Sequence, residues 1–361
     1  LNDAIVGMAQ DFVGSNNIPW FVPQGQFGTR LQGGSDAASP RYIHTYLQPY
    51  VKNLVPEEDF AVLTYRDDDG LLVEPEWYAP ILPMLLINGC RGIGTGYSTF
   101  IPPFNPKHLK GMILKWLEMG DGLDEMLIPW VRGFTGRIEM EKETECILSG
   151  KMEGDTITEL PVGTWTADVR EKLDDLVKDG KLKDYTDMST DTTVCIKVKA
   201  EDKSVLDKIL TDKWKLTNMH AFDSRGVIRK YASPNEILKE FVGVRLGLYE
   251  TRREAMLKAL KDKLPYHENV VRFIRQQCED TPRPDLRRKT PEECDSLLSS
   301  EKFVRIRESF DYLMNLPISS LTLKNAQKQE KDLDELKKSI TELEKMTSKQ
   351  MWKSELNALN V

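Results

Sequence analysis

The stretch that decides how this chain is interpreted is Ser39-Pro-Arg-Tyr42, which follows the glycine-rich loop Gly33-Gly-Ser-Asp36. Proline fits the first turn of a helix, so the stretch predicts a helix that begins at Pro40. The amino end of a helix and a guanidinium both favour an anion. Arg30, which ends Gly25-Gln-Phe-Gly-Thr-Arg30, could approach the same place. The residues therefore suggest a phosphate site with Tyr42 in it.

Two interpretations of Tyr42 remain open from these residues. A phenol acts as a nucleophile only when a cation or a metal stabilises its oxyanion, and Arg41 is the adjacent cation. The alternative is a half-buried aromatic ring next to a surface charge. Local chemistry alone favours that alternative, because most tyrosines simply pack.

A second glycine-rich run is Gly89-Cys-Arg-Gly-Ile-Gly-Thr-Gly96. It fails the dinucleotide pattern, because Tyr97 stands three positions after Gly94, and it fails the P-loop pattern for want of a lysine. Ile93 is either packed in the core or exposed as a wedge of the kind that kinks DNA. The segment alone favours the core.

The acidic run Asp67-Asp-Asp69, followed by Gly70, could hold a metal or form a hairpin turn. Leu71 breaks the EF-hand pattern, so a solvated turn is the favoured interpretation.

Three regions of different texture indicate an α+β multidomain chain, with boundaries near 56 and 232. In the first, an apolar helical face over residues 5–13 ends at Gly14. The second mixes strand-like segments with amphipathic helices. We expect its strands over 63–65, 71–73, 136–140, 146–150, 156–160 and 193–198, and its helices over 106–119, 166–179 and 204–213.

The third region, residues 233–361, is predominantly helical. Ser233-Pro234 is a start signal, and apolar residues then recur at coiled-coil spacing, as they do again over 333–343. Prolines within 281–284 and at Pro291 interrupt the pattern. Two long helices around a small insert predict an antiparallel arm with a helical tip.

Composition excludes several other classes of protein. The 361 residues carry 50 Lys+Arg against 57 Asp+Glu, a net charge of −7, which argues against a generally basic nucleic-acid coat protein. No apolar run is long enough for a membrane span. Five scattered cysteines fit a reducing compartment, and neither they nor the four histidines have zinc spacing. A start without Met suggests a piece of a longer protein.

Long motifs in one order make the chain resemble eukaryotic-type (type IIA) DNA topoisomerases II, specifically the C-terminal part of their DNA breakage-reunion core. The resemblance spans almost the whole chain. The matching stretches are 10–17, 25–30, 33–34, 38–43, 73–78, 80–83, 88–96, 101–106, 157–161, 164–165, 191–193, 221–223, 316–317 and 351–352.

The resemblance implies that Tyr42 attacks a DNA phosphodiester to form a 5'-phosphotyrosyl link, with Arg41 offsetting the developing charge. It implies that Ile93 inserts between base pairs, against the local interpretation. The DNA-binding positions that it implies are Arg30, Gln10, Ile93, Gln26 and Thr95. Residues 1–56 would be a partial winged-helix domain, 57–232 an α/β tower, and 233–361 a coiled-coil arm with an exit-gate dimerisation tip.

The implied function is the DNA gate of an ATP-dependent type II topoisomerase, which breaks one duplex, passes a second through it and reseals. The implied partners are double-stranded DNA and a second copy of the chain, with no membrane. Mg²⁺ and ATP would be bound outside this chain, in an ATPase and a metal-binding region on the same or a separate polypeptide. We expect an intracellular protein: nuclear if it comes from a eukaryotic cell, and in the virion or host cell if viral.

Two other hypotheses stay open. One is a DNA-bending coiled-coil dimer that does not cut, and the other is a purely structural dimer.

Overall fold

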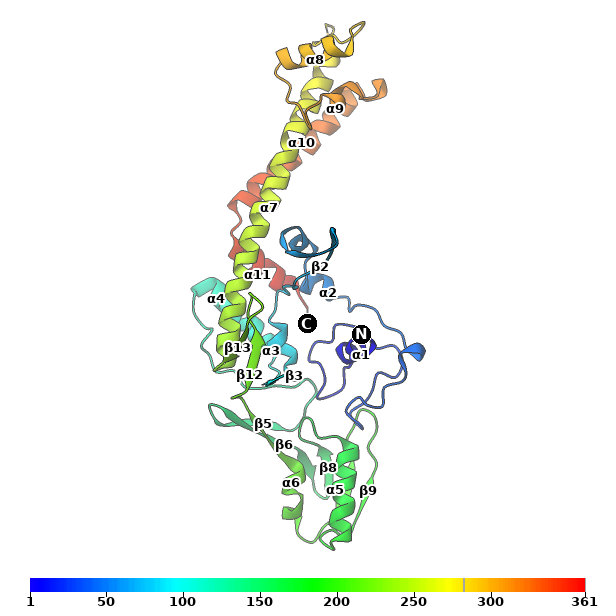
Figure 1. The fold of residues 1–361 in the computed structure, drawn as a ribbon, viewed down its shortest axis with the longest axis vertical. Coiled ribbons are helices and arrows are strands. Elements are labelled where there is room, and N and C mark those ends of the chain that lie inside the picture. The colour runs from blue at the N-terminus through cyan, green and yellow to red at the C-terminus, as the bar shows by residue number, and fades with distance from the viewer. Residues whose placement is uncertain (282, 361) are drawn as a thin grey trace. The chain divides into compact units, whose positions relative to one another are not determined.

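The computed structural model describes residues 1–281 and 283–360. It divides into two compact units, Leu1–Gly247 with Trp352–Val361, and Leu248–Met351. The strands all belong to the first unit and the second is helical, so the chain is mixed α and β with one very long helix, as the colours of Figure 1 allow the reader to follow.

The first region is mostly loops held by a small core. Helix α1 (Asn2–Ala9) ends five residues before Gly14, and the expected helix at Pro40 is only a 3-10 turn, Pro40–Tyr42. Both helices are thus shorter than expected. Ala9, Phe27 and Ile43 pack together instead, so tertiary contacts hold this segment where helical hydrogen bonds do not.

The acidic run forms the hairpin turn that the sequence favours. Strands β1 (Tyr65–Asp68) and β2 (Leu71–Pro75) are antiparallel, and Asp69 and Gly70 take left-handed φ values of 51° and 87° between them. The 3-10 helix Glu57–Val62 precedes this hairpin. Helices α2 (Val51–Leu54) and α3 (Met84–Asn88) flank the whole segment.

Two antiparallel sheets form the middle of the first unit. One has the order β11-β6-β5, from Thr211–Lys215, Glu145–Ser149 and Arg137–Lys142. The other has the order β7-β8-β10-β9, from Lys151–Glu153, Thr156–Glu159, Ile196–Lys199 and Asp184–Asp187. Helix α5 (Thr166–Lys178) covers the second sheet through Val169 and Leu173 (Figure 1).

The expected helix over 204–213 is wrong in its second half. A 3-10 turn (Lys203–Leu206) and the short α6 (Asp207–Leu210) are followed by strand β11, in which Trp214 pairs with Cys146. Pairing with a ready sheet edge outweighs the local helical pattern. The expected helix over 106–119 is confirmed as α4 (Pro106–Met119), and the Asn105 side chain caps its amino end.

Two further hairpins lie next to each other in the first unit. Strands β3 (Cys90–Gly94) and β4 (Tyr97–Ile101) form one, and β12 (Met219–Phe222) and β13 (Ile228–Tyr231) form the other. Strand β4 contacts β12, where the Phe100 amide donates to the Asn218 carbonyl at 2.8 Å.

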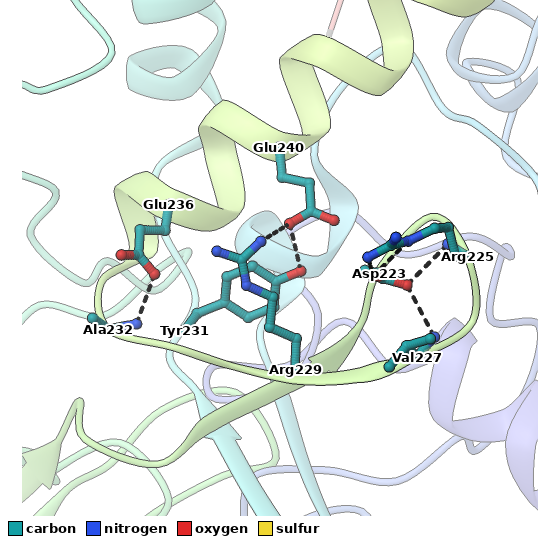
Figure 2. Close-up of polar contacts among 8 residues, drawn as sticks. All are labelled: Asp223, Arg225, Val227, Arg229, Tyr231, Ala232, Glu236 and Glu240. Atoms are coloured by element: carbon teal, nitrogen blue, oxygen red, sulfur yellow. Dashed lines mark hydrogen bonds and ion pairs between the residues drawn. The ribbon is translucent and has the colours of Figure 1, made fainter.

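The β12–β13 hairpin is tied to the start of α7 (Pro234–Gln277) by polar contacts. Glu240 accepts hydrogen bonds from Arg229 Nη1 at 3.0 Å and from Tyr231 Oη at 2.9 Å, and Glu236 accepts from the Ala232 amide (Figure 2). A helix therefore fixes the second hairpin, which in turn supports the first.

The second unit pairs the later part of α7 with α10 (Leu323–Lys345). Ion pairs join Lys261 to Glu344, Glu268 to Lys337 and Arg275 to Glu330, so positions rise along α7 while they fall along α10. The expected antiparallel helix pair is therefore present.

The expected helical tip is also present in the second unit. Helices α8 (Pro291–Ser300) and α9 (Asp311–Met314) and the 3-10 turn Ile318–Ser320 share one apolar core with both long helices. The chain then continues into α11 (Ser348–Ala358). Of the expected proline break at 281–284, Pro282 lies outside the described residues. None of the described helices is both long and apolar enough to cross a membrane.

Candidate functional site

Tyr42 points into solvent, contrary to the half-buried packing role that local chemistry favours. Its side chain is 72% exposed, while the next residue, Ile43, is buried beside Phe27. The backbone bridge between Gln24 and His44 fixes the chain directly after it, with two 3.1 Å hydrogen bonds. A rigid, extended anchor thus presents a mobile phenol.

Arg41 accompanies this phenol. Its guanidinium carbon lies 5.7 Å from the centre of the Tyr42 ring, and the arginine is itself exposed. Because the turn Pro40–Tyr42 has only three residues, no helix dipole contributes here, and that part of the anion argument does not hold. The cation that remains beside the phenol is Arg41.

The loop before Tyr42 is held from within by amide groups. The side chain of Gln10 donates to the Phe27 carbonyl at 2.9 Å, so Gln10 is used in fixing this loop. Thr29 donates twice to Asp36, at 2.8 and 2.6 Å. Gln26 is exposed and lines a hollow of about 420 Å³, so its side chain remains open to a ligand.

Arg30 does not reach the surface beside Tyr42. It is 7% exposed, and its guanidinium pairs with Glu159, which is 2% exposed. The other Glu159 oxygen accepts from the amide and hydroxyl of Thr135 at 3.2 and 3.1 Å. The expected approach of Arg30 to a phosphate is thus replaced by a buried ion pair with the β8 strand.

Trp165 holds the same loop from the start of α5. Its ring meets Phe12 edge to face at 5.7 Å, and Gly33, at φ 61°, lies so close that a Cβ there would overlap the indole. The Ala167 amide also donates to the Leu31 carbonyl at 3.0 Å. Trp165 and Glu159 are positioning groups that the sequence does not single out. A carboxylate inside the apolar run Ile157–Val162 is the signal that could have revealed Glu159.

Ile93 lies at the end of the β3–β4 hairpin and is 93% exposed, so core burial is wrong. Gly96 takes a left-handed φ of 79° in the two-residue turn that it forms with Thr95, and Thr95 is also exposed. The hairpin therefore projects an apolar side chain and a hydroxyl away from the protein.

Buried amides join the Tyr42 segment to the segment that carries Ile93. Asn17 donates to the carbonyls of Ile87 and Trp130 at 2.8 and 3.1 Å and accepts from the Arg132 amide at 2.8 Å. Asn88, directly before the hairpin, exchanges two hydrogen bonds with the Ile18 backbone, at 2.8 and 2.9 Å. The two exposed groups thus stand on one interlocked framework.

Comparison with known proteins places these features in context. The family model described as DNA gyrase/topoisomerase IV matches residues 1–357. The DNA topoisomerase 2 of Arabidopsis thaliana is 36% identical to the chain over its full length, and that of Saccharomyces cerevisiae is 34% identical. The DNA topoisomerase 2 of Invertebrate iridescent virus 6 is 35% identical over 98% of the chain.

The chain spans 28%, 30% and 32% of the lengths of these three relatives, respectively. A solved structure covers 99% of the chain with a TM-score of 0.84 and 32% identity, and the match spans 54% of that structure. It is the crystal structure of the Plasmodium falciparum topoisomerase II DNA-binding, cleavage and re-ligation domain.

Proposed function

This chain belongs to the DNA gyrase/topoisomerase IV family, whose eukaryotic-type members are the DNA topoisomerases 2, and from that premise we propose that it forms part of the DNA gate of a type II topoisomerase. The observation that carries the proposal is the exposed phenol of Tyr42 beside the exposed guanidinium of Arg41, on a loop that buried contacts hold from several sides.

The proposed reaction is a transesterification. The Tyr42 Oη attacks a backbone phosphorus, the bond from phosphorus to the 3' oxygen breaks, and a 5'-phosphotyrosyl link forms. The phenol loses its proton and the departing 3' oxygen gains one. Arg41 offsets the negative charge that grows on the phosphate oxygens. The reverse reaction reseals the strand, so no bond energy is lost to water.

The other predicted site residues take roles that agree with their placement. Ile93 is the wedge that enters a base step, and Thr95 and Gln26 are exposed polar groups able to contact the DNA. Gln10 supports the loop through Phe27. For Arg30 we now propose a positioning role through Glu159, because a buried and paired guanidinium is not available to a phosphate.

We also propose the family's finer division of the chain. Residues 1–56 are a partial winged-helix domain, 57–232 the tower, and 233–361 the arm and exit gate at which two copies meet. The antiparallel pairing of α7 with α10 supports the last assignment. The proposed setting is intracellular, with duplex DNA as substrate.

Mg²⁺ and ATP belong to the proposed activity of the complete enzyme. Across residues 1–281 and 283–360, no group of three or more His, Cys, Asp or Glu side chains is placed to hold a metal ion. These residues therefore do not fit a metal, and we derive no step through one. We propose that both Mg²⁺ and ATP are held outside this chain.

The test is a Tyr42→Phe substitution in the full-length protein, with covalent protein–DNA adducts measured after a denaturant quench. We expect the adduct to disappear while duplex binding persists. Tyr46→Phe, at another exposed tyrosine of the same segment, is the matched control. Adduct at the wild-type level in Tyr42→Phe would refute the assignment. Absence of adduct from the wild-type protein that still bends DNA would favour the non-cutting module.

A further inference from the structure

Arg91 lies two residues before Ile93 on the β3 strand. Side chains two apart on a strand share a face and stand about 6.6 Å from each other. The register confirms the common face, since Arg91 is opposite Phe100 and Ile93 opposite Ser98 on β4. Both side chains are exposed, so a cation and an apolar side chain project side by side from one hairpin.

The Arg91 side chain is held in place by aromatic rings. Its guanidinium carbon lies 5.1 Å from the centre of the Phe100 ring, and that ring meets Trp214 edge to face at 5.4 Å. Trp214 is buried on β11. A guanidinium stacked on a fixed ring loses less freedom when it binds an anion than a fully mobile one.

No carboxylate neutralises this cation among residues 1–281 and 283–360 at ion-pair distance. Most other cations of the first unit are occupied. Arg229, for example, pairs with Glu240 at 3.0 Å, as Figure 2 shows, and Arg225 pairs with Asp223. Arg91 thus keeps its full charge for a ligand, beside the proposed wedge.

The strand beneath Arg91 is also supported from behind. The Asn218 amide donates to Ser98 Oγ at 2.8 Å, and the Thr99 hydroxyl donates to the His220 carbonyl at 2.8 Å. These contacts join β4 to β12, whose hairpin Glu240 ties to α7. The position of Arg91 relative to Ile93 is therefore a property of the folded protein.

We infer that Arg91 binds a backbone phosphate next to the base step that Ile93 enters. This inference rests on the proposed function. An inserted wedge unstacks a step at a cost of a few kcal/mol, which contacts to the bent backbone must offset. A charge-assisted bond from Arg91 to a flanking phosphate offsets part of that cost where the distortion is greatest.

The alternative is a purely structural role, in which Arg91 only covers the Phe100 ring. The two roles differ in a measurable way. A phosphate contact releases a counterion, so its removal lowers the steepness of the dependence of log K on log salt by about 1. Loss of a packing contact lowers stability and leaves the salt dependence unchanged.

The experiment measures binding of the full-length protein to a labelled duplex over a series of salt concentrations, and bending of the same duplex by fluorescence energy transfer. We expect Arg91→Gln to lower the steepness by about 1, and Arg91→Lys to retain most of it. Arg307→Gln removes the same charge from an exposed site in the second unit and should leave the steepness unchanged. Ile93→Ala should reduce bending with little change in steepness.

The outcomes separate this inference from the proposed function. If Ile93→Ala reduces bending but Arg91→Gln keeps the wild-type steepness, the assignment of Arg91 is overturned and the proposed function stands. A wild-type protein that neither binds nor bends the duplex overturns both. Arg91→Lys guards against misfolding, because it keeps the charge and the long side chain over Phe100.

Discussion

The guanidinium of Arg30 forms a buried ion pair with the carboxylate of Glu159, which stands 129 residues further along the chain. Each partner is almost inaccessible to water, so each depends on the other for compensation of its charge. The loop that leads to Tyr42 is thereby attached to the sheet that contains β8. Removal of either charge should affect both the stability and the presentation of the phenol.

Glu159→Gln should therefore be costly. Breaking a buried pair by removing one partner costs about 3–5 kcal/mol, because the other charge is left uncompensated. Urea unfolding followed by tryptophan fluorescence measures the loss. Glu153→Gln is the matched control, because its pair with Lys151 on the neighbouring strand β7 is exposed, and little change is expected there. Similar stabilities for the two variants would contradict the role given to Glu159.

Gly33→Ala should disturb the Tyr42 loop. Gly33 has a φ of 61°, and a Cβ there would overlap the Trp165 indole, so we expect a loss of more than about 1 kcal/mol together with less covalent adduct. Gly180→Ala separates the two causes, because Gly180 has a φ of 68° with open space around it. Equal losses at the two sites would show that contact with Trp165 contributes nothing.

Asn17→Ala should weaken the framework between the two exposed groups. It leaves the Ile87 and Trp130 carbonyls and the Arg132 amide without this partner, and each unsatisfied buried group costs about 1–3 kcal/mol. Asn53→Ala, at an exposed asparagine, is the control for chemical denaturation. An unchanged unfolding midpoint in Asn17→Ala would refute the framework.

Tyr231 should contribute to a loss of stability in alkali. Burial, followed by the hydrogen bond to Glu240, raises the pKa of Tyr231 from 10.0 to about 12. The unfolded chain therefore releases this phenolic proton first, so the stability that Tyr231 contributes is complete below pH 10.0 and is lost as the pH rises to about 12.

Tyr231→Phe should make that alkaline loss shallower when the urea midpoint is followed against pH. Some loss remains, because burial also raises the pKa of Tyr50 to about 12. The exposed Tyr46→Phe should behave like the wild type. An identical loss in Tyr231→Phe and wild type would argue against the contribution of Tyr231.

The sequence predicted local elements well where one pattern dominated. The Asp69-Gly70 turn, helix α4 behind Asn105 and the antiparallel helix pair all follow from short-range signals. Local patterns failed where a distant partner decided the outcome. Residues 211–215 became a strand because β6 offers them an edge, and the Pro40 helix stopped after one turn because Ile43 is drawn into a core with Ala9.

The same distinction holds for the site. Arg41 and Tyr42 are neighbours in sequence, so their association was predictable. The exposure of Ile93 was not, because an isoleucine between glycines suits a core as well as a hairpin tip, and only the resemblance to topoisomerases suggested otherwise. Nothing local to Arg30 reveals that its partner is Glu159, so its burial emerged only from the three-dimensional arrangement.

The long-range attachment of the Tyr42 loop also bears on the order in which the chain becomes competent during synthesis. Tyr42 leaves the ribosome well before the Asn17 partners at Ile87 and Trp130, and before Glu159 and Trp165. A nascent chain that stops short of those residues carries the nucleophile without the groups that hold its loop. Contacts of high sequence separation thus postpone assembly of a strand-breaking site until most of its unit has been made.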